Sequence, residues 1–278
     1  MNSLNEFDPK KFWQDHDKQI KNHGPSGSVL LSHDLYRGMP EWFNQYFSTF
    51  QQRAFKTLLR ERQFPQSAKA IDLGCGTGRW IGLMGSLGWD PVGIDLGFQA
   101  IEFAKVRWNA AKFVVGAIPD LCFQMEWFDI AVSVTVIQHL PRNLQQEALH
   151  AVGNLLKPGG YFFICESIYL DEPSPHVFSN SYPEWVKLFQ NAGFYVEKAV
   201  GTEFLPIVNT FQKIRGRLKK PSSSPPDVSA VANVLHRNLL FRLLVKIGIS
   251  IAYPLEWISS FLLPIQRARL VFFCLRKI

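Results

Sequence analysis

The chain has 278 residues, of which 47% are hydrophobic and 19% are charged, a composition that excludes a disordered or fibrous protein. Its four cysteines are widely spaced and form no CxxC pair, so the sequence predicts no structural zinc site. The first 24 residues are polar and lack the apolar run of an export signal, so we expect a cytoplasmic protein.

The formal net charge of +7 is unevenly distributed along the chain. Residues 207–278 contain 12 Lys and Arg against 2 Asp and Glu, whereas residues 1–206 contain 18 against 21. The C-terminal quarter is therefore strongly basic, and the rest is slightly acidic. Such an asymmetry indicates a separate interaction for the C-terminal quarter.

The N-terminal region is predicted to contain one helix. Residues 1–28 are expected to be rich in loops, because glycine and proline break the chain at 24, 25 and 27. Residues 41–62 are typical of an amphipathic helix, since apolar side chains recur there at intervals of three and four.

Short apolar runs then alternate with helical patterns as far as residue 206. The runs predicted as strands are 69–73, 91–95, 112–116, 128–136, 161–167 and 194–200. One helical pattern begins near Arg79, and three others cover 97–111, 144–156 and 181–193. This alternation predicts an α/β fold with a parallel sheet covered on both faces. Ligands of such sheets bind beyond the carboxyl ends of the strands, at the switch point of the strand order.

The alternation stops after residue 206. Residues 216–227, GRLKKPSSSPPD, have the composition of a linker. Residues 233–265 are very apolar with interspersed basic residues. Pro254, Glu256 and Pro264 interrupt this apolar run, so the segment is a poor candidate for a membrane span. Residues 267–277 are typical of a final strand.

The stretch IDLGCGTGRW at residues 71–80 places three glycines at alternate positions after an apolar strand. Glycine lets the backbone approach a ligand closely and adopt positive φ, and the next helix offers N–H groups to an anionic group. Dinucleotides and S-adenosylmethionine both use such a turn. The dinucleotide pattern would require a third glycine at Arg79, where this sequence has none.

The GxGxG pattern led by Asp72 resembles motif I of the class I S-adenosylmethionine-dependent methyltransferases. Asp95 ends the second predicted strand, and residues 132–141 and 155–167 resemble later segments of that family. The resemblance implies a seven-stranded, mostly parallel sheet with helices on both faces, an N-terminal helical lid and a helical insertion before the last strand. It divides the chain into a lid (1–66), a cofactor-binding core (67–206 plus 266–278) and a basic, apolar helical insertion (207–265).

The same resemblance implies a set of residues for the cofactor, with S-adenosylhomocysteine as product. Asp72 would meet the methionine amine, Asp95 the ribose hydroxyls, and Arg79 the methionine carboxylate. The remaining members are Gly74, Cys75, Gly76 and Gly78 in the turn, Leu96 and the backbone of Ala117 and Ile118 around the adenine, and Thr135 near the sulfonium. Taken singly, Asp72 could instead be a helix cap and Asp95 a turn residue.

Two residues are candidates for a general base. His139 follows the fourth predicted strand and has an unperturbed pKa near neutrality. Glu166 lies at the carboxyl end of the fifth. Each could instead have a structural role: His139 could pack against or cap the following helix, and Glu166 could be a turn residue. His33, Tyr36, Arg37, Trp42 and Tyr46 belong to the expected lid and could contact substrate, although Trp42 and Tyr46 also suit a helix core.

Several methyltransferase subclasses are excluded by the residues after the fourth strand. TVIQ stands where DNA N-methyltransferases carry their Pro-Pro-aromatic run, and the chain has no Pro-Cys pair for cytosine C5 chemistry. Thr135, Gln138 and His139 do not supply the carboxylates of metal-dependent catechol-type enzymes. The sequence therefore predicts a metal-independent enzyme.

The sequence favours transfer of a methyl group to a hydroxyl of a small or lipid-like metabolite. An N-methyltransferase acting on a small amine or a protein N-terminus is the alternative enzyme, and a non-catalytic cofactor-binding or membrane-scaffold protein is the alternative outside catalysis. For residues 233–265 three hypotheses stay open: peripheral contact with a membrane, a pocket cap or homodimer interface, and nucleic acid. The last is least favoured, because the GRLKK run lacks aromatic residues that stack on bases.

Overall fold

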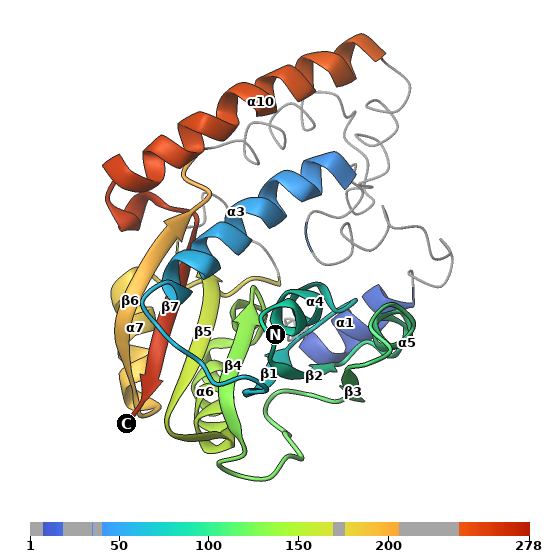
Figure 1. Cartoon of the computed structure of the whole chain (residues 1–278), viewed down its shortest axis with the longest axis vertical. Helices are drawn as coiled ribbons and strands as arrows, with labels where there is room; N and C mark the ends of the chain where they lie inside the picture. Colours follow the sequence, from blue (N-terminus) through green and yellow to red (C-terminus); the bar gives the residue numbers. More distant parts are fainter. Residues whose placement is uncertain (1–7, 19–34, 36–40, 169–175, 206–238) are drawn as a thin grey trace, which may run out of the picture.

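The computed structural model describes residues 8–18, 35, 41–168, 176–205 and 239–278. His33, Tyr36 and Arg37 of the expected lid, and the predicted linker at 216–227, lie outside the described residues. Figure 1 shows a central twisted sheet with helices on either side of it.

The described part of the chain forms one sheet of seven strands in the order β3-β2-β1-β4-β5-β7-β6. The strands are β1 (Lys69–Leu73), β2 (Asp90–Asp95), β3 (Lys112–Val115), β4 (Phe128–Val134), β5 (Leu156–Ser167), β6 (Phe194–Thr202) and β7 (Leu270–Lys277). Only β7 runs antiparallel to its neighbours, β5 and β6. The predicted seven-stranded, mostly parallel α/β fold is confirmed.

The helices cover both faces of this sheet. They are α1 (Pro9–Asp17), α3 (Glu41–Leu59), α4 (Arg79–Ser86), α5 (Phe98–Arg107), α6 (Arg142–Leu155), α7 (Tyr182–Asn191) and α10 (Leu239–Leu262), with short 3-10 helices η2 (Ile137–His139) and η3 (Ile265–Arg267). Buried residues of α6 and α7 belong to one hydrophobic cluster. Those of α3, α4 and α5 belong to a second cluster on the other face.

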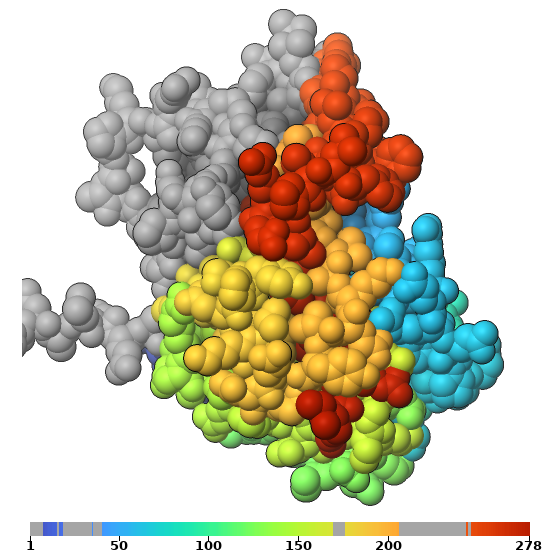
Figure 2. Space-filling view, turned by 90° about the vertical axis from the view of Figure 1, so that its left-hand side faces the viewer, coloured from blue at the N-terminus to red at the C-terminus, as the bar shows by residue number. Residues whose placement is uncertain are grey.

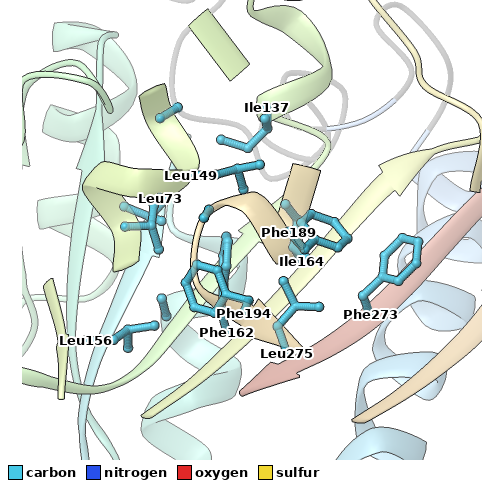
Figure 3. Packing of buried hydrophobic residues seen from close by; sticks show 14 of the residues in the cluster. Leu73, Ile137, Leu149, Leu156, Phe162, Ile164, Phe189, Phe194, Phe273 and Leu275 are labelled. Carbon is cyan, nitrogen blue, oxygen red and sulfur yellow. The ribbon is translucent and has the colours of Figure 1, made fainter. Parts of the chain in front are cut away.

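Strand β5 shows how the sequence builds both clusters. Successive side chains of a strand point to opposite faces of the sheet. Phe162 and Ile164 therefore pack in the cluster with α6 and α7, which Figure 3 shows from close by. Phe163 and Cys165 pack in the cluster with α3 and α4. All four are fully buried, as expected for a strand covered on both faces.

The strand order reverses between β1 and β4. The chain passes outward from β1 through β2 to β3 and then returns to β4 on the other side of β1. The connections after β1 and β4 therefore leave in opposite directions and open a crevice beyond the carboxyl ends of the strands. The sequence predicted a ligand site at this edge.

Helix α1 corrects the prediction of a loop-rich segment at its position. The run PKKFWQDHD forms a helix, and the side chain of Asp8 caps it by accepting a hydrogen bond from the N–H of Lys11 at 3.1 Å. Pro9 occupies the first helical position, where proline is favoured. The breakers that motivated the loop prediction lie further along the chain.

Helix α10 lies in the segment predicted as a helical insertion, which was expected to be a poor membrane span. The helix continues through Pro254 to Leu262. None of the described helices is long and apolar enough to cross a membrane.

Candidate cofactor and active site

A cavity of about 350 Å³ lies at the carboxyl ends of β1, β2, β3 and β4. It is lined by residues of the connections after these four strands, with α1 forming a further wall. Of the predicted site residues, those that line it are Gly74, Cys75, Gly76, Arg79, Asp95, Leu96, Ala117, Ile118, Thr135 and His139. Nine of the eleven predicted cofactor residues thus line the cavity, all except Asp72 and Gly78. The fold brings them together from four strand ends that lie far apart in the sequence.

The turn after β1 can be made only by glycine at two positions. Gly74 and Gly78 adopt φ of +71° and +83°, in the region that L-residues rarely enter. A Cβ atom would lie 2.5 Å from Cγ2 of Val136 at Gly74, and 2.6 Å from Cδ1 of Trp108 at Gly78. Gly78 therefore shapes the turn by packing, without lining the cavity itself.

Asp95 connects the end of β2 to the glycine turn. Its Oδ2 atom accepts a hydrogen bond from the N–H of Gly76 at 2.8 Å, and its Oδ1 atom accepts one from Gly97 at 2.7 Å. Each carboxylate oxygen can accept more than one hydrogen bond, so both can also accept from ligand hydroxyls. Asp72, by contrast, is 1% exposed within β1 and does not line the cavity.

Asp17 at the end of α1 fastens this helix over the cavity. It is 5% exposed, and its two oxygens accept hydrogen bonds from the N–H groups of Gln99 and Ala100 at 2.8 and 2.9 Å. These N–H groups begin α5, whose own N-cap residue, Gly97, has no side chain to cap them. Sequence analysis missed Asp17, because its partners are more than 80 residues away along the chain.

Replacement of Asp17 by alanine should loosen α1 and weaken the cavity wall. Loss of a helix cap costs about 1 kcal/mol, so we expect a lower midpoint of thermal unfolding and weaker cofactor binding by calorimetry. Asp15→Ala is the matched control, since Asp15 lies on the same helix and pairs with the exposed side chain of Lys18. Equal effects of the two substitutions would contradict the role of Asp17.

Arg79 extends from the start of α4 into the cavity wall. Its Nη1 atom donates a hydrogen bond to Oε1 of Gln51 on α3 at 2.9 Å, and its guanidinium lies 5.0 Å from the ring centre of Trp80. Gln51 in turn donates to Glu203, which pairs with Arg269. Helix α3 thus orients Arg79 through a chain of polar contacts.

Glu166 holds the segment after β4. It is fully buried and accepts hydrogen bonds from the backbone N–H groups of Val136, Ile137 and Gln138 at 3.3, 2.9 and 3.1 Å. Burial raises its pKa to about 8, against the opposing effect of these hydrogen bonds. Glu166 does not line the cavity. Its contacts favour a structural role, in which it positions η2 and with it His139.

His139 is the candidate base that lines the cavity. Its Nδ1 atom lies 2.7 Å from the carbonyl oxygen of His176, and a carbonyl can only accept, so Nδ1 carries the hydrogen. The lone pair is then on Nε2. The edge of the Trp13 ring packs on the imidazole with centroids 4.8 Å apart. Burial lowers the pKa of His139 to about 4, so its imidazole is neutral at physiological pH.

Trp42 and Tyr46 of the expected lid lie away from this cavity. Tyr46 packs against Phe50 and against Tyr253 of α10, and Trp42 lies near Lys246 of α10. These aromatic residues form the contact between α3 and α10, which agrees with the alternative of a helix core.

Three further cavity or near-cavity residues were not predicted. Asp120 lines the cavity three residues after Ala117 and supplies a carboxylate that the sequence lacks at position 117. Trp13 and His176 contact His139 from segments far away in the sequence. No group of three His, Cys, Asp or Glu residues is placed to hold a metal ion within the described residues.

Comparison with known proteins shows what the central part of the chain resembles. Residues 71–164 match the model of a methyltransferase domain. The chain is 28% identical over 101 residues to an Arabidopsis thaliana tRNA (carboxymethyluridine(34)-5-O)-methyltransferase, covering 36% of this chain and 24% of the relative. It is 27% identical over 100 residues to the ubiquinone biosynthesis O-methyltransferase of Salmonella newport, covering 34% and 40%. The matches thus span less than half the length of these relatives.

The fold agrees with this assignment. A phosphoethanolamine N-methyltransferase 2 from Haemonchus contortus, solved with S-adenosylmethionine, superposes with a TM-score of 0.59 at 15% identity, covering 99% of this chain and 61% of that one. Residues 71–164 resemble a methyltransferase domain, and the chain has the fold of the class I S-adenosylmethionine-dependent methyltransferases. S-adenosylmethionine is the cofactor of that class.

The residues of the cavity fit this cofactor. The positive φ values at Gly74 and Gly76 bring bare backbone to the cavity, and the Asp95 carboxylate lies at the end of the adjacent strand. Arg79 offers a cation for a carboxylate, and Leu96 and Ile118 offer apolar surface for a base. A ligand with an amino-acid end, a ribose and a base finds a matching group for each part.

Proposed function

We propose that this protein is a methyltransferase that transfers a methyl group from S-adenosylmethionine to a hydroxyl of a small or lipid-like metabolite. The observation that carries the proposal is the shared cavity of the glycine turn, Asp95 and the neutral imidazole of His139. Both relatives described above are named as enzymes that methylate an oxygen atom, which supports a hydroxyl acceptor.

When bound, the cofactor supplies an electrophilic methyl group on a sulfonium. Asp95 would hold its ribose through the carboxylate oxygens, and Arg79 would pair with its carboxylate. His139 would accept the proton of the acceptor hydroxyl at Nε2, because Nδ1 is engaged with the carbonyl of His176. Pro9 and Trp13 of α1 would help to exclude water from the cavity, so that positioning contributes much of the rate.

The neutral state of His139 favours this assignment. A base must be unprotonated before it acts, and burial keeps the imidazole in that state at physiological pH. A hydroxyl needs such a base more than a neutral amine does, because the amine already has a lone pair for attack. The N-methyltransferase alternative therefore makes less use of His139.

The test is label transfer from methyl-labelled S-adenosylmethionine into an extract of the host, followed by partition between organic and aqueous phases. Label in an organic or small aqueous product as an acid-stable methyl ether supports the proposal. A methylated amine or protein N-terminus would favour the N-methyltransferase. Cofactor binding without any release of S-adenosylhomocysteine would favour the non-catalytic alternative.

A further inference from the structure

Helix α10 is attached to the core along one face. Glu256 is 2% exposed, and its two oxygens accept hydrogen bonds from the N–H groups of Phe204 and Leu205 at 2.7 and 2.9 Å, just beyond β6. The ring of Tyr253 packs on Phe50 of α3 with centroids 4.8 Å apart. These contacts set the rotation of the helix about its axis, and hence which residues face outward.

The opposite face of α10 is apolar and exposed. We call it the outer face; its residues are Leu243, Ile247, Ile251, Leu255, Ile258 and Leu262, with exposed fractions of 43–75%. They recur at intervals of four, four, four, three and four, which places them on one side of an α-helix. At 1.5 Å per residue the line is about 28 Å long. A continuous apolar surface of this extent marks an interaction site.

The exposed charges described on and just beyond α10 are positive. Among the described side chains of α10, only Lys246 and Glu256 are charged, and Glu256 is buried in its hydrogen bonds. Lys246 and, beyond the helix, Arg267 are exposed. In the sequence, 12 Lys and Arg face 2 Asp and Glu over residues 207–278. An exposed apolar helix face with basic residues near it along the chain complements a membrane of acidic lipids, whose headgroups are anionic and whose interior is apolar.

The position of α10 relates this surface to the cavity. In Figure 1 the helix lies beyond the end of the sheet toward which β4, β5 and β6 point. The cavity lies at the carboxyl ends of the parallel strands, which is the same end of the sheet. Figure 2 shows the red atoms of α10 at the surface, above the yellow and orange atoms of residues 176–205.

We propose that the outer face of α10 docks on an anionic lipid bilayer, so that the methyltransferase acts on an acceptor held in that membrane. The helix would lie in the plane of the interface with its apolar residues below the headgroups. The choice of a membrane-borne acceptor rests on the proposed methyltransferase function, whereas the docking itself does not.

The test is sedimentation of the full chain with vesicles of phosphatidylcholine, with or without phosphatidylglycerol. We expect the wild type to sediment with the phosphatidylglycerol vesicles, and less so as salt is added. The double variant Ile247→Glu/Ile251→Glu should bind at least about tenfold more weakly, since it replaces two buried apolar contacts by charges that anionic lipid repels. Val106→Glu is the matched control, because Val106 is an 83% exposed apolar residue on α5.

Three results would overturn the proposal: no sedimentation of the wild type at low salt, equal sedimentation of the double variant, or a wild-type dimer that the double variant converts to monomer. The last would make the outer face an interface between copies of this chain. Cofactor binding by calorimetry and the thermal midpoint are measured on every variant. Failure of the wild type to bind cofactor would contradict the proposed function and leave the vesicle result to be judged separately.

Discussion

Replacement of His139 by alanine is expected to lower kcat by about 10²- to 10⁴-fold, the range of a general base, while cofactor affinity changes little. The imidazole lines the cavity, and its Nδ1 atom is engaged with the carbonyl of His176, so Nε2 is the atom that could accept a proton. His150→Ala is the matched control, because His150 is exposed on α6. Initial rates with the acceptor found by label transfer, and calorimetry with S-adenosylmethionine, measure the two effects.

The pH dependence of the proposed methyl transfer gives a second measure of His139. Burial lowers the pKa of its imidazole to about 4, so the base stays unprotonated from neutral pH down to about pH 5. The rate should therefore be nearly constant over that range and fall only as the pH approaches 4. A loss of activity centred near pH 6.5 would indicate an unburied histidine. An unchanged kcat in His139→Ala would remove His139 from the chemistry.

Replacement of Asp95 by alanine is expected to weaken cofactor binding by about 1–3 kcal/mol, the contribution of a charge-assisted hydrogen bond. This corresponds to a dissociation constant about 5- to 150-fold higher. The side chain accepts hydrogen bonds from the N–H groups of Gly76 and Gly97, so its loss also loosens the turn that would approach the cofactor.

The control for Asp95 lies on the same strand. Asp90 begins β2, is exposed and lies at the opposite end from the cavity, so Asp90→Ala should leave cofactor affinity unchanged. Calorimetric titration of both variants makes the comparison, with thermal unfolding as the check on folding. Binding by Asp95→Ala as tight as that of the wild type would contradict the cofactor site described above.

The features that sequence analysis predicted correctly are those encoded in neighbouring residues. The glycine turn needs bare backbone at defined positions, and the strands show as short apolar runs between helical patterns. The sheet could therefore be predicted from 69 to 206, together with the positions of Gly74 and Asp95 at strand ends. Asp8 and Pro9 also form a local start signal for helix α1, which the loop prediction overlooked.

Other features depend on residues that meet only in the folded chain. The sequence indicated Glu166 as a candidate base. In the structure its carboxylate lies outside the cavity and accepts hydrogen bonds from the backbone N–H groups of Val136, Ile137 and Gln138. Asp17 gave no local signal, because the N–H groups that it caps belong to α5. For helix α10, its composition indicated an amphipathic segment, whereas the hydrogen bonds of Glu256 beyond β6 select which face is turned outward. Local backbone preference and periodicity are properties of short segments, but a buried carboxylate takes its role from whichever donors the fold places beside it.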